Sequence, residues 1–400
     1  TANWSINKFT VNIVSNNTAY GTVDVAKVDN VPYGSKVTVS GNTITVNGTK
    51  VTATATANTA QYTYAFSSWS LANNATITGA TTVTATFTQT VNKYTVTIAV
   101  NNANYGSVSQ TSVKDVPYGT TLTANSNVVT INGTKVTATV KELAGYTTTF
   151  SSWTNGTATV KGNLTVTANF ARDTIKYTIT YNLNGGTVAT ANPTTYTIET
   201  ATFTLNNPTK NGYTFTGWTG SNGTTAQTAV SIAKGSTGNR TYTANWSVVT
   251  YTITYNLNGG QISGQKTTYT IETATFTLPQ PTKNGYTFTG WTGSNGTTAQ
   301  TTVTIAKGST GNKSYTANWS TVSYTITYNL AGGSVATANP TTYTIETATF
   351  TLHNPTRQGY TFAGWTGTGL SSASTSVSIA KGSTGNRTYT ATWTPNTNTA

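Results

Sequence analysis

Internal repetition is the feature that most constrains this chain, because one short module occurs three times in its second half. Blocks that are identical or nearly so follow one another in the same order in each copy. The strings YTITYNL, TTYTIETATFTL and IAKGSTGN begin at residues 177, 251 and 324, at 194, 267 and 341, and at 232, 305 and 379. The period is 73–74 residues. Self-similarity at a fixed period predicts tandem units of one architecture.

A second, related module occurs twice before these copies. The pairs KFTVNI and KYTVTI, VPYG, VNGTKVTAT and INGTKVTAT, and FSSW recur with a period of about 84 residues. Both module types have an opening strand, a turn, an aromatic segment that ends in Trp, and a closing strand with an A-x-F/W pattern. We therefore predict a common plan for all copies.

The repeats divide the chain into five modules with short connections. Residues 1–7 are interpreted as the end of a preceding repeat and a linker, and 394–400 as a polar tail. The predicted modules 1 to 5 are residues 8–88, 93–171, 176–246, 250–319 and 323–393. Connections of about four residues permit little independent swinging, so we expect an elongated, semi-rigid array.

The fold class predicted from residue patterns is mainly β. Tyr177, Ile179 and Tyr181 alternate with Thr and Asn, which is the period of a strand with one buried face. The phase of the apolar residues changes at Glu199–Thr200, which predicts a bulge or sharp bend there. The only helical candidates are short segments such as Ala226–Ile232.

Composition argues against catalysis and cofactors. The 400 residues include no Cys, one His and 8 acidic residues, and the acids at Glu199, Glu272 and Glu346 are one position repeated in successive copies. Such a chain offers almost no material for a catalytic triad or dyad. Thiolate metal sites have no ligands here, and calcium sites lack clustered carboxylates. We predict a protein that is not an enzyme and that binds no metal or cofactor.

The net charge of +13 comes from a shortage of acids rather than from a basic patch. The 21 Lys and Arg residues form no run, whereas nucleic-acid and membrane-surface partners favour clustered charge. No apolar stretch of about 18 residues is present to span a membrane. We therefore expect neither nucleic-acid binding nor membrane insertion.

Two sharper hypotheses concern specific residues. Lys234, Glu199 and Asn245 could form a Lys–Asn isopeptide bond promoted by a buried acid, with Lys307, Glu272 and Asn318 as the next such trio. The alternative is that the Glu caps a bulge and the Lys is solvated. Thr392 replaces the reacting amide in the last copy. Each bond would release one ammonia, so intact mass would detect it.

The second hypothesis concerns the amino-terminal Thr1, Ala2, Asn3 and Trp4, which repeat the closing TANW of the longer array without the module before it. They are candidates for a strand donated to a neighbouring sheet. The simpler interpretation is that a longer array is cut at this point.

The recurring aromatics have two interpretations. Tyr213, Phe215 and Trp218 occupy fixed places in every copy, which favours the core of a small module. The same rings would serve as a platform for stacking on sugars if they were exposed.

The three carboxy-terminal copies resemble the Listeria–Bacteroides repeat, also called the internalin B-repeat. The motifs that carry the resemblance are Y-x-I-x-Y-N-L-x-G-G, P-T-K-x-G-Y-x-F-x-G-W, G-S-T-G-N and the closing A-N-W, over 176–393. Residues 8–171 are similar to divergent relatives of that repeat. The resemblance implies small β-grasp-like modules in long microbial surface proteins, with spacer, adhesion or interaction roles and no catalysis.

The predicted function is therefore a structural section, a stalk or fibre, of an extracellular, adhesin-like cell-surface protein. One alternative is an adhesion module that binds a surface glycan or protein, and another is a subunit of a self-assembling extracellular filament. The expected partners are the other modules of the same long chain, like chains in a fibre, and a surface glycan or protein.

Overall fold

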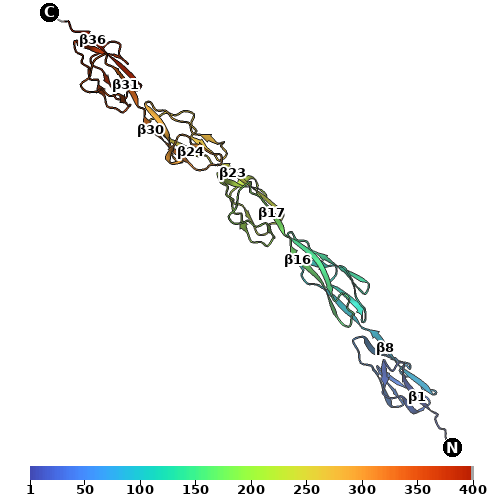
Figure 1. Cartoon of the computed structure of the whole chain (residues 1–400). Coiled ribbons are helices and arrows are strands. Elements are labelled where there is room, and N and C mark those ends of the chain that lie inside the picture. The colour runs from blue at the N-terminus through green and yellow to red at the C-terminus, as the bar shows by residue number, and fades with distance from the viewer. Residues whose placement is uncertain (398–400) are drawn as a thin grey trace. The chain divides into compact units, whose positions relative to one another are not determined.

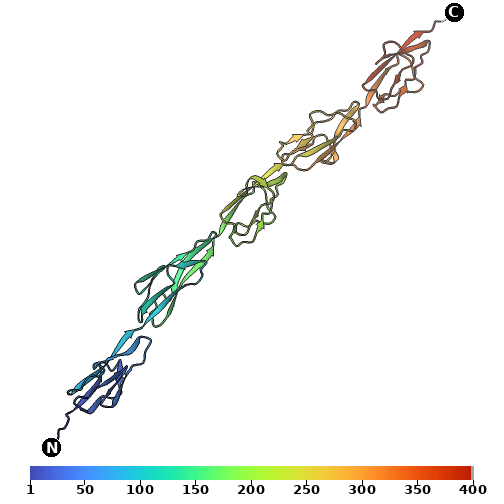
Figure 2. The same cartoon turned by 180° about the vertical axis from the view of Figure 1, so that it is seen from behind.

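The computed structural model describes residues 1–397, and strands are its only regular elements, so the predicted mainly-β class is confirmed (Figures 1 and 2). Because the described residues form no helix, none of them makes a helix that could cross a membrane. Two compact units account for the chain. The first holds residues 1–178, 195–202 and 233–239, and the second holds the remaining described residues.

Modules 1 and 2 each contain two four-stranded sheets. In module 1 the sheet orders are β3-β1-β8-β7 and β2-β6-β5-β4, and module 2 repeats them as β11-β9-β16-β15 and β10-β14-β13-β12. The first and last strands of each module, β1 with β8 and β9 with β16, are parallel neighbours at the centre of a sheet. The strands are β1 Lys8–Ser15, β2 Gly21–Val23, β3 Lys27–Pro32, β4 Thr38–Ser40, β5 Thr43–Val46, β6 Thr49–Ala55, β7 Tyr62–Trp69, β8 Thr81–Val91, β9 Lys93–Val100, β10 Gly106–Val108, β11 Ser112–Pro117, β12 Thr123–Asn125, β13 Val128–Ile131, β14 Thr134–Val140, β15 Tyr146–Thr154 and β16 Leu164–Thr174.

Modules 3 to 5 keep the same main sheet but replace the second sheet with a short two-stranded one. The main sheets have the orders β18-β17-β23-β20-β21, β25-β24-β30-β27-β28 and β32-β31-β36-β34. The two-stranded sheets are β19-β22, β26-β29 and β33-β35. The strands of modules 3 and 4 are β17 Tyr177–Asn182, β18 Thr195–Tyr196, β19 Phe203–Thr204, β20 Tyr213–Gly220, β21 Gly223–Gln227, β22 Ser231–Ile232, β23 Arg240–Val248, β24 Tyr251–Asn256, β25 Thr268–Tyr269, β26 Phe276–Thr277, β27 Tyr286–Gly293, β28 Gly296–Gln300, β29 Thr304–Ile305 and β30 Lys313–Thr321. Those of module 5 are β31 Tyr324–Asn329, β32 Thr342–Tyr343, β33 Phe350–Thr351, β34 Tyr360–Gly367, β35 Ser378–Ile379 and β36 Arg387–Pro395.

All five modules therefore share one main sheet. When the four strands common to these sheets are counted in chain order, they lie side by side as second, first, fourth and third, and the first and fourth strands are parallel. This is the order of a β-grasp sheet, without a helix in the described residues. The helical candidate Ala226–Ile232 is wrong, because β21 and β22 occupy that stretch. Every side chain of β21 is exposed, so its backbone pairing with β20 holds it rather than an apolar face. The predicted bend at Glu199–Thr200 is present as a turn in which the Thr200 N–H donates to the Thr197 carbonyl, at 3.1 Å.

The closing strands run further than the sequence pattern predicts, so the connections are shorter than expected. β8 ends at Val91, β16 at Thr174, β23 at Val248 and β30 at Thr321. Only one or two residues then separate each closing strand from the next opening strand. β36 likewise extends through Pro395 into the segment expected to be a tail, and the Asn396 N–H donates to the Gly359 carbonyl at 3.0 Å. Residues 398–400 of that tail lie outside the described residues. Each closing strand continues to pair through its backbone after its last aromatic residue. The side chains of this extension show no apolar alternation, so the sequence pattern does not reveal it.

Candidate functional site

The feature that recurs at the modules' ends is a joint between one module and the next. In one module the contacting residues are a Gly-Tyr pair, which ends a turn and begins a β-strand. In the following module they are the Ile-Glu pair of a turn. In unit 2 the Tyr213 hydroxyl donates to Oε1 of Glu272 at 2.6 Å, and the Tyr286 hydroxyl donates to Oε1 of Glu346 at 2.8 Å. In unit 1 the Tyr146 hydroxyl donates to Oε1 of Glu199 at 3.0 Å.

An isoleucine packs on a glycine beside each of these hydrogen bonds. A Cβ atom built on Gly285 would lie 2.5 Å from Cδ1 of Ile345, and one on Gly212 would lie 2.6 Å from Cδ1 of Ile271. These glycines have φ of +78° and +76°, a conformation that other residues rarely adopt. The joint therefore requires glycine both for its turn and for the close approach of isoleucine.

Main-chain bonds complete the joint. The Val322 N–H donates to the Gly285 carbonyl at 2.9 Å, and the Val249 N–H donates to the Gly212 carbonyl at 2.9 Å. The two-residue connection is thereby tied to the module that it leaves. Hydrogen bonds at both the backbone and the side chain restrict how freely the connection can bend.

A cation covers the ring of each joint tyrosine in the repeats. Nζ of Lys283 lies 4.0 Å from the Tyr286 ring centroid and donates to the Asn258 carbonyl at 2.9 Å. Lys210 lies over Tyr213 at 4.1 Å in the same way. The hydrogen bond to Glu346 raises the pKa of Tyr286, because ionisation of the phenol would remove the donated proton and place two negative charges together. The phenol therefore remains a donor at neutral pH.

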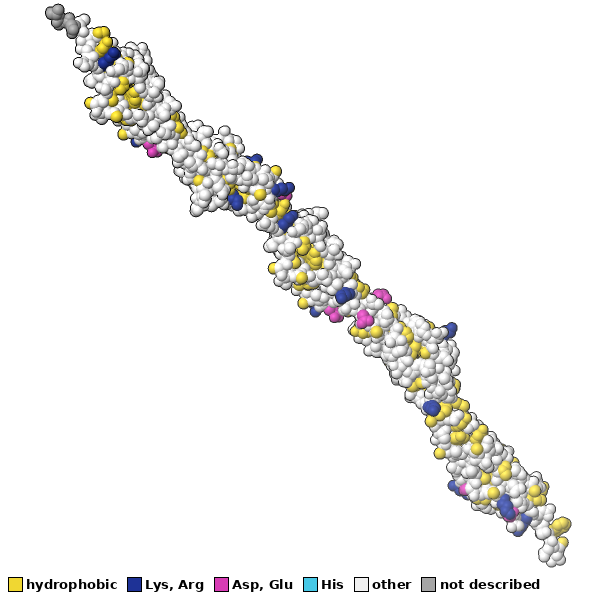
Figure 3. Space-filling view, in the orientation of Figure 1, with side chains coloured by type: hydrophobic (Ala, Val, Ile, Leu, Met, Phe, Trp, Pro, Cys, Tyr) yellow, Lys and Arg dark blue, Asp and Glu magenta, His cyan; other side chains and the backbone are white. Residues whose placement is uncertain are grey.

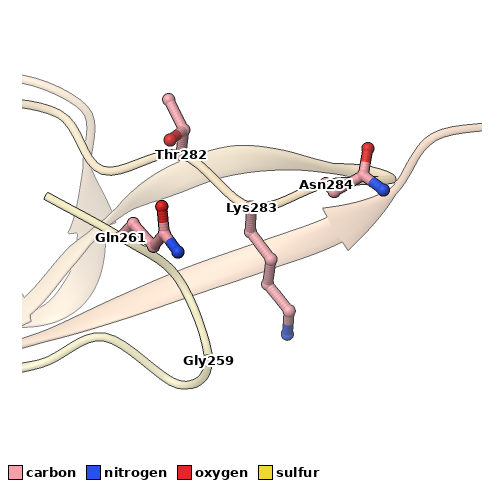
Figure 4. Close-up of a pocket in the computed structure, with 5 residues that line it drawn as sticks. All are labelled: Gly259, Gln261, Thr282, Lys283 and Asn284. Carbon is pink, nitrogen blue, oxygen red and sulfur yellow. The ribbon is translucent and has the colours of Figure 1, made fainter.

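A polar cavity of about 480 Å³ lies beside the joint tyrosine of module 4. Gly259, Gln261, Thr282, Lys283 and Asn284 line it. Figure 4 shows that Lys283 and Asn284 point in different directions, so their polar groups do not converge on a common point. Within the described residues, no cluster of three or more acidic or imidazole groups could hold a metal ion.

The proposed isopeptide residues are placed separately in module 4. The Asn318 amide donates to the Gly290 carbonyl, the Thr292 hydroxyl and the Thr316 carbonyl at 3.0–3.2 Å. Lys307 is exposed and precedes β30 by six residues, and the N–H of the next residue, Gly308, donates to the Ile271 carbonyl at 2.9 Å. Asn318 is the sixth residue of β30, which at ~3.3 Å per residue lies about 17 Å further along the strand.

The structure therefore places the backbone beside Lys307 at the Ile271–Glu272 turn, and it holds the Asn318 amide on oxygens of β27 and β30. In module 3, Asn245 likewise donates to the Gly217 carbonyl, and Glu199 accepts from Tyr146. Lys234 is exposed, and its backbone N–H donates to Thr202. The isopeptide bond stays a prediction for intact mass to test, and the repeated Glu has an observed role in the joint.

The amino-terminal candidates belong to no strand. Residues 1–7 precede β1, and Trp4 is 92% exposed. Strand donation by Thr1, Ala2, Asn3 and Trp4 remains a prediction. The recurring aromatics, by contrast, form core: Trp218, Trp291 and Trp365 are fully buried, and Phe288 packs edge-on against Trp291. The expectation of a core role is confirmed at these tryptophans.

Sequence reasoning found the repeated Glu but missed its partner. Tyr146, Tyr213 and Tyr286 are 53, 59 and 60 residues from the glutamates that they contact, in the preceding module. The sequence does carry one signal for this pair: the Gly-Tyr and the Ile-Glu dipeptides both recur once in each of modules 3 to 5, with the same period. Outside these joints the face shown in Figure 3 carries few, widely spaced charged side chains.

The comparisons with known proteins agree with these motifs. A family model described as the Listeria-Bacteroides repeat domain matches residues 177–245, 251–318 and 324–394, together just over half of the chain. The chain therefore belongs to the Listeria-Bacteroides repeat family, and the resemblance seen in the motifs is confirmed. The relation of residues 8–171 to that family stays a prediction.

One curated relative is Internalin H of Listeria monocytogenes, which is 37% identical over 84 residues. This match covers 21% of the chain and 15% of that protein, so the chain spans only a small part of it. Among solved structures, two B repeat units of the collagen binding protein of Staphylococcus aureus align with 98% of this chain and all of that one. The sequence identity is 10% and the TM-score is 0.11.

Proposed function

We propose that this chain is a non-catalytic, structural section of an extracellular surface protein, a stalk that sets the distance between the parts it joins. Membership of a repeat family and similarity to a segment of an internalin support a surface role. The observation that carries the proposal is the recurring joint, in which a Tyr–Glu hydrogen bond and an Ile–Gly contact secure connections of two residues.

The physical argument concerns the freedom of each connection. A flexible linker would let neighbouring modules sample many angles, and the distance along the chain would shrink accordingly. Connections of two residues that are hydrogen-bonded to the preceding module reduce that sampling. The same elements recur at the three joints that link modules 2 to 5, and a single residue, Asn92, links modules 1 and 2.

The test is small-angle scattering combined with light scattering on the 400-residue chain over a range of concentrations. A monomer with an elongated profile is expected. A compact profile would overturn the proposal. Growth into long particles with concentration would replace it with the filament alternative.

A joint variant makes the test specific. Ile345→Ala combined with Glu346→Gln removes the packing and the charged acceptor at one joint, and a shorter average end-to-end distance is expected. Glu142→Gln is the matched control, because Glu142 is an exposed acid of module 2 that lies outside the Tyr–Glu pairs of the joints. Equal profiles for the joint variant, the control and the parent chain would show that the joint does not restrain the modules.

A further inference from the structure

Arg172 of β16 is the centre of a site that adjoins the joint between modules 2 and 3. Its Nε donates to Oγ1 of Thr148 at 2.8 Å, and its Nη2 donates to the carbonyls of Asn104 and Lys141 at 2.8 and 2.7 Å. Its guanidinium carbon lies 4.4 Å from the Tyr105 ring centroid. Three hydrogen bonds and a stacked ring hold the guanidinium in one place.

Two cavities flank this fixed guanidinium. Their volumes are about 400 and 390 Å³, and both are lined by Tyr105, Leu143 and Arg172. Each volume lies within the range of ~300–1,000 Å³ that is usual for small-molecule sites. Leu143 is 51% exposed, so its apolar side chain is accessible in both cavities. The cavities therefore combine apolar surface with fixed polar groups.

Module 1 shows how the site arises. In its equivalent strand pair, Tyr64 lies opposite Gln89, where module 2 has Thr148 opposite Arg172. The Tyr64 ring lies 5.9 Å from that of Tyr20, which occupies the place of Tyr105 in the matching N-N-x-x-Y-G segment. A large ring thus occupies the place that module 2 gives to Thr148, a small side chain that is 7% exposed. The exchange of Tyr for Thr leaves room for the arginine to stack on Tyr105.

The charged groups around the cavities define the chemistry of a ligand. Glu142 lines one cavity, and Asp173 and Glu199 line the other, in a chain with only 8 acidic residues. Arg172 donates to one hydroxyl and two carbonyl oxygens, and Oε1 of Glu199 accepts from Tyr146, so the carboxylates of Glu142 and Asp173 are the acceptors that face a ligand. The acids disfavour an anionic ligand, and the guanidinium shared by both cavities disfavours a cationic one.

We propose that the two cavities around Arg172 bind a neutral oligosaccharide. The C–H faces of sugar rings fit the surfaces of Tyr146 and Leu143, and their hydroxyl groups fit the carboxylates of Asp173 and Glu142. The ligand class follows from this combination of an aromatic ring and an aliphatic side chain with acceptors at the same site. The site adds glycan binding to a chain section whose other features are structural.

The experiment is a glycan array probed with the 400-residue chain, followed by calorimetric titration of the neutral oligosaccharides that give signal. The test variant carries Thr148→Tyr and Arg172→Gln, which rebuilds the arrangement that module 1 already tolerates. We expect at least a tenfold weaker binding, which corresponds to ~1.4 kcal/mol. Circular dichroism and hydrogen exchange of module 2 verify that the variant is folded.

The reverse exchange provides a matched variant in module 1. Tyr64→Thr with Gln89→Arg opens the equivalent place there without the acids of module 2, and binding through the intact module 2 is expected to stay within about twofold of the parent chain. Three outcomes would overturn the proposal. They are no binding of any neutral oligosaccharide, equal binding by the Thr148→Tyr, Arg172→Gln variant, and binding confined to sulfated glycans, sialylated glycans or basic peptides.

Discussion

The two amino-terminal modules and the three carboxy-terminal repeats form the same main sheet from different materials. Modules 1 and 2 fill their cores with Val and Ile from two four-stranded sheets, such as Ile44, Val46 and Val51. The repeats have fewer and shorter strands, and their cores depend on Trp and Tyr, such as Trp291 and Tyr315. Large aromatic side chains each bury ~150–250 Å², so a few of them replace the area that a second sheet supplies.

This difference restricts which residue can occupy one position of the strand before the core Trp. Both regions have a β-bulge just before the core Trp of the module, at Phe66/Ser68 in module 1 and at Phe288/Gly290 in module 4. Module 4 adds β28 beside β27, and the Gln300 nitrogen would lie 2.5 Å from a Cβ on Gly290. The extra strand therefore requires glycine where module 1 has serine.

The largest expected effect comes from exchanging these bulge residues. Gly290→Ser should destabilise module 4 by about 3–5 kcal/mol, because the new side chain meets the backbone of β28 and φ is +136°. Ser68→Gly should cost only about 0.5–1 kcal/mol, through backbone entropy. Hydrogen exchange of peptides from each module measures both, with the unchanged modules of the same chain as references. Equal effects would mean that the added strand does not impose the glycine.

Alkaline pH should separate the two regions next. Burial raises the pKa of Tyr181, Tyr255 and Tyr328 to about 12. Because these values lie above the ~10 of an exposed tyrosine, their stabilising contribution is complete below about pH 10 and is lost as pH rises through about 12. We expect the repeats to lose aromatic circular dichroism in this window, together with the appearance of tyrosinate absorbance.

Tyr255→Phe is the control for this titration. The variant should move the alkaline transition of module 4 to higher pH, since it removes a group that must ionise. A transition that begins in modules 1 and 2 instead would contradict the assignment to buried tyrosines of the repeats.

A smaller effect is expected at a buried indole. Nε1 of Trp218 donates to Asn207 and that of Trp365 to Asn354, at 3.0 and 3.2 Å. Trp291 has no such partner among the described residues, where Gln280 stands in place of the asparagine. Gln280→Asn should stabilise module 4 by about 1 kcal/mol.

The converse change in module 5 controls for this prediction. Asn354→Gln should destabilise module 5 by about 1–3 kcal/mol, since it leaves a buried donor unpaired. The stability of the other modules should not change. Denaturant titration followed by hydrogen exchange compares the two. In modules 1 and 2 the Nε1 atoms of Trp69 and Trp153 have no hydrogen-bond partner among the described residues. An asparagine that accepts from the core indole is therefore found in modules 3 and 5 and not in modules 1 and 2.

The smallest expected effect concerns Thr392. Its hydroxyl donates to the Gly364 carbonyl at 2.6 Å, whereas Asn318 at the matching place makes three bonds through its amide. Thr392→Asn should stabilise module 5 by at most about 1 kcal/mol, because the position is only half-buried. Exchange rates in β34 and β36 report the change, and a loss of protection there would contradict it.

Residue patterns predicted the strands that carry an apolar face and missed those held only by backbone pairing. The alternation of Tyr251, Ile253 and Tyr255 predicts β24, whose buried face it forms. β28 has no such face, since all of its side chains are exposed. Its place depends on Gly290 and on contacts that no local pattern records.

The candidate sites were predictable only in part, for a related reason. The recurrence of Glu272 in each repeat indicates that this position has a role. Its partner Tyr213 belongs to another module, 59 residues away, so the pair is not apparent from the sequence. The site at Arg172 needs the register that places Thr148 opposite it, which a sequence alone does not supply. Chemistry that depends on one module's residues is visible in a repeat pattern, whereas chemistry at the boundary between modules is not.

The parallel pairing of the first and last strands has a mechanical consequence. In module 4, β24 follows the chain's entry and β30 precedes its exit, and they pair in register from Ile253–Lys313 to Asn256–Thr316. Tension applied at the two ends of the module pulls these neighbours in opposite directions along their length. The bonds between them then bear the load together in shear rather than opening one after another, so each module resists extension as a unit.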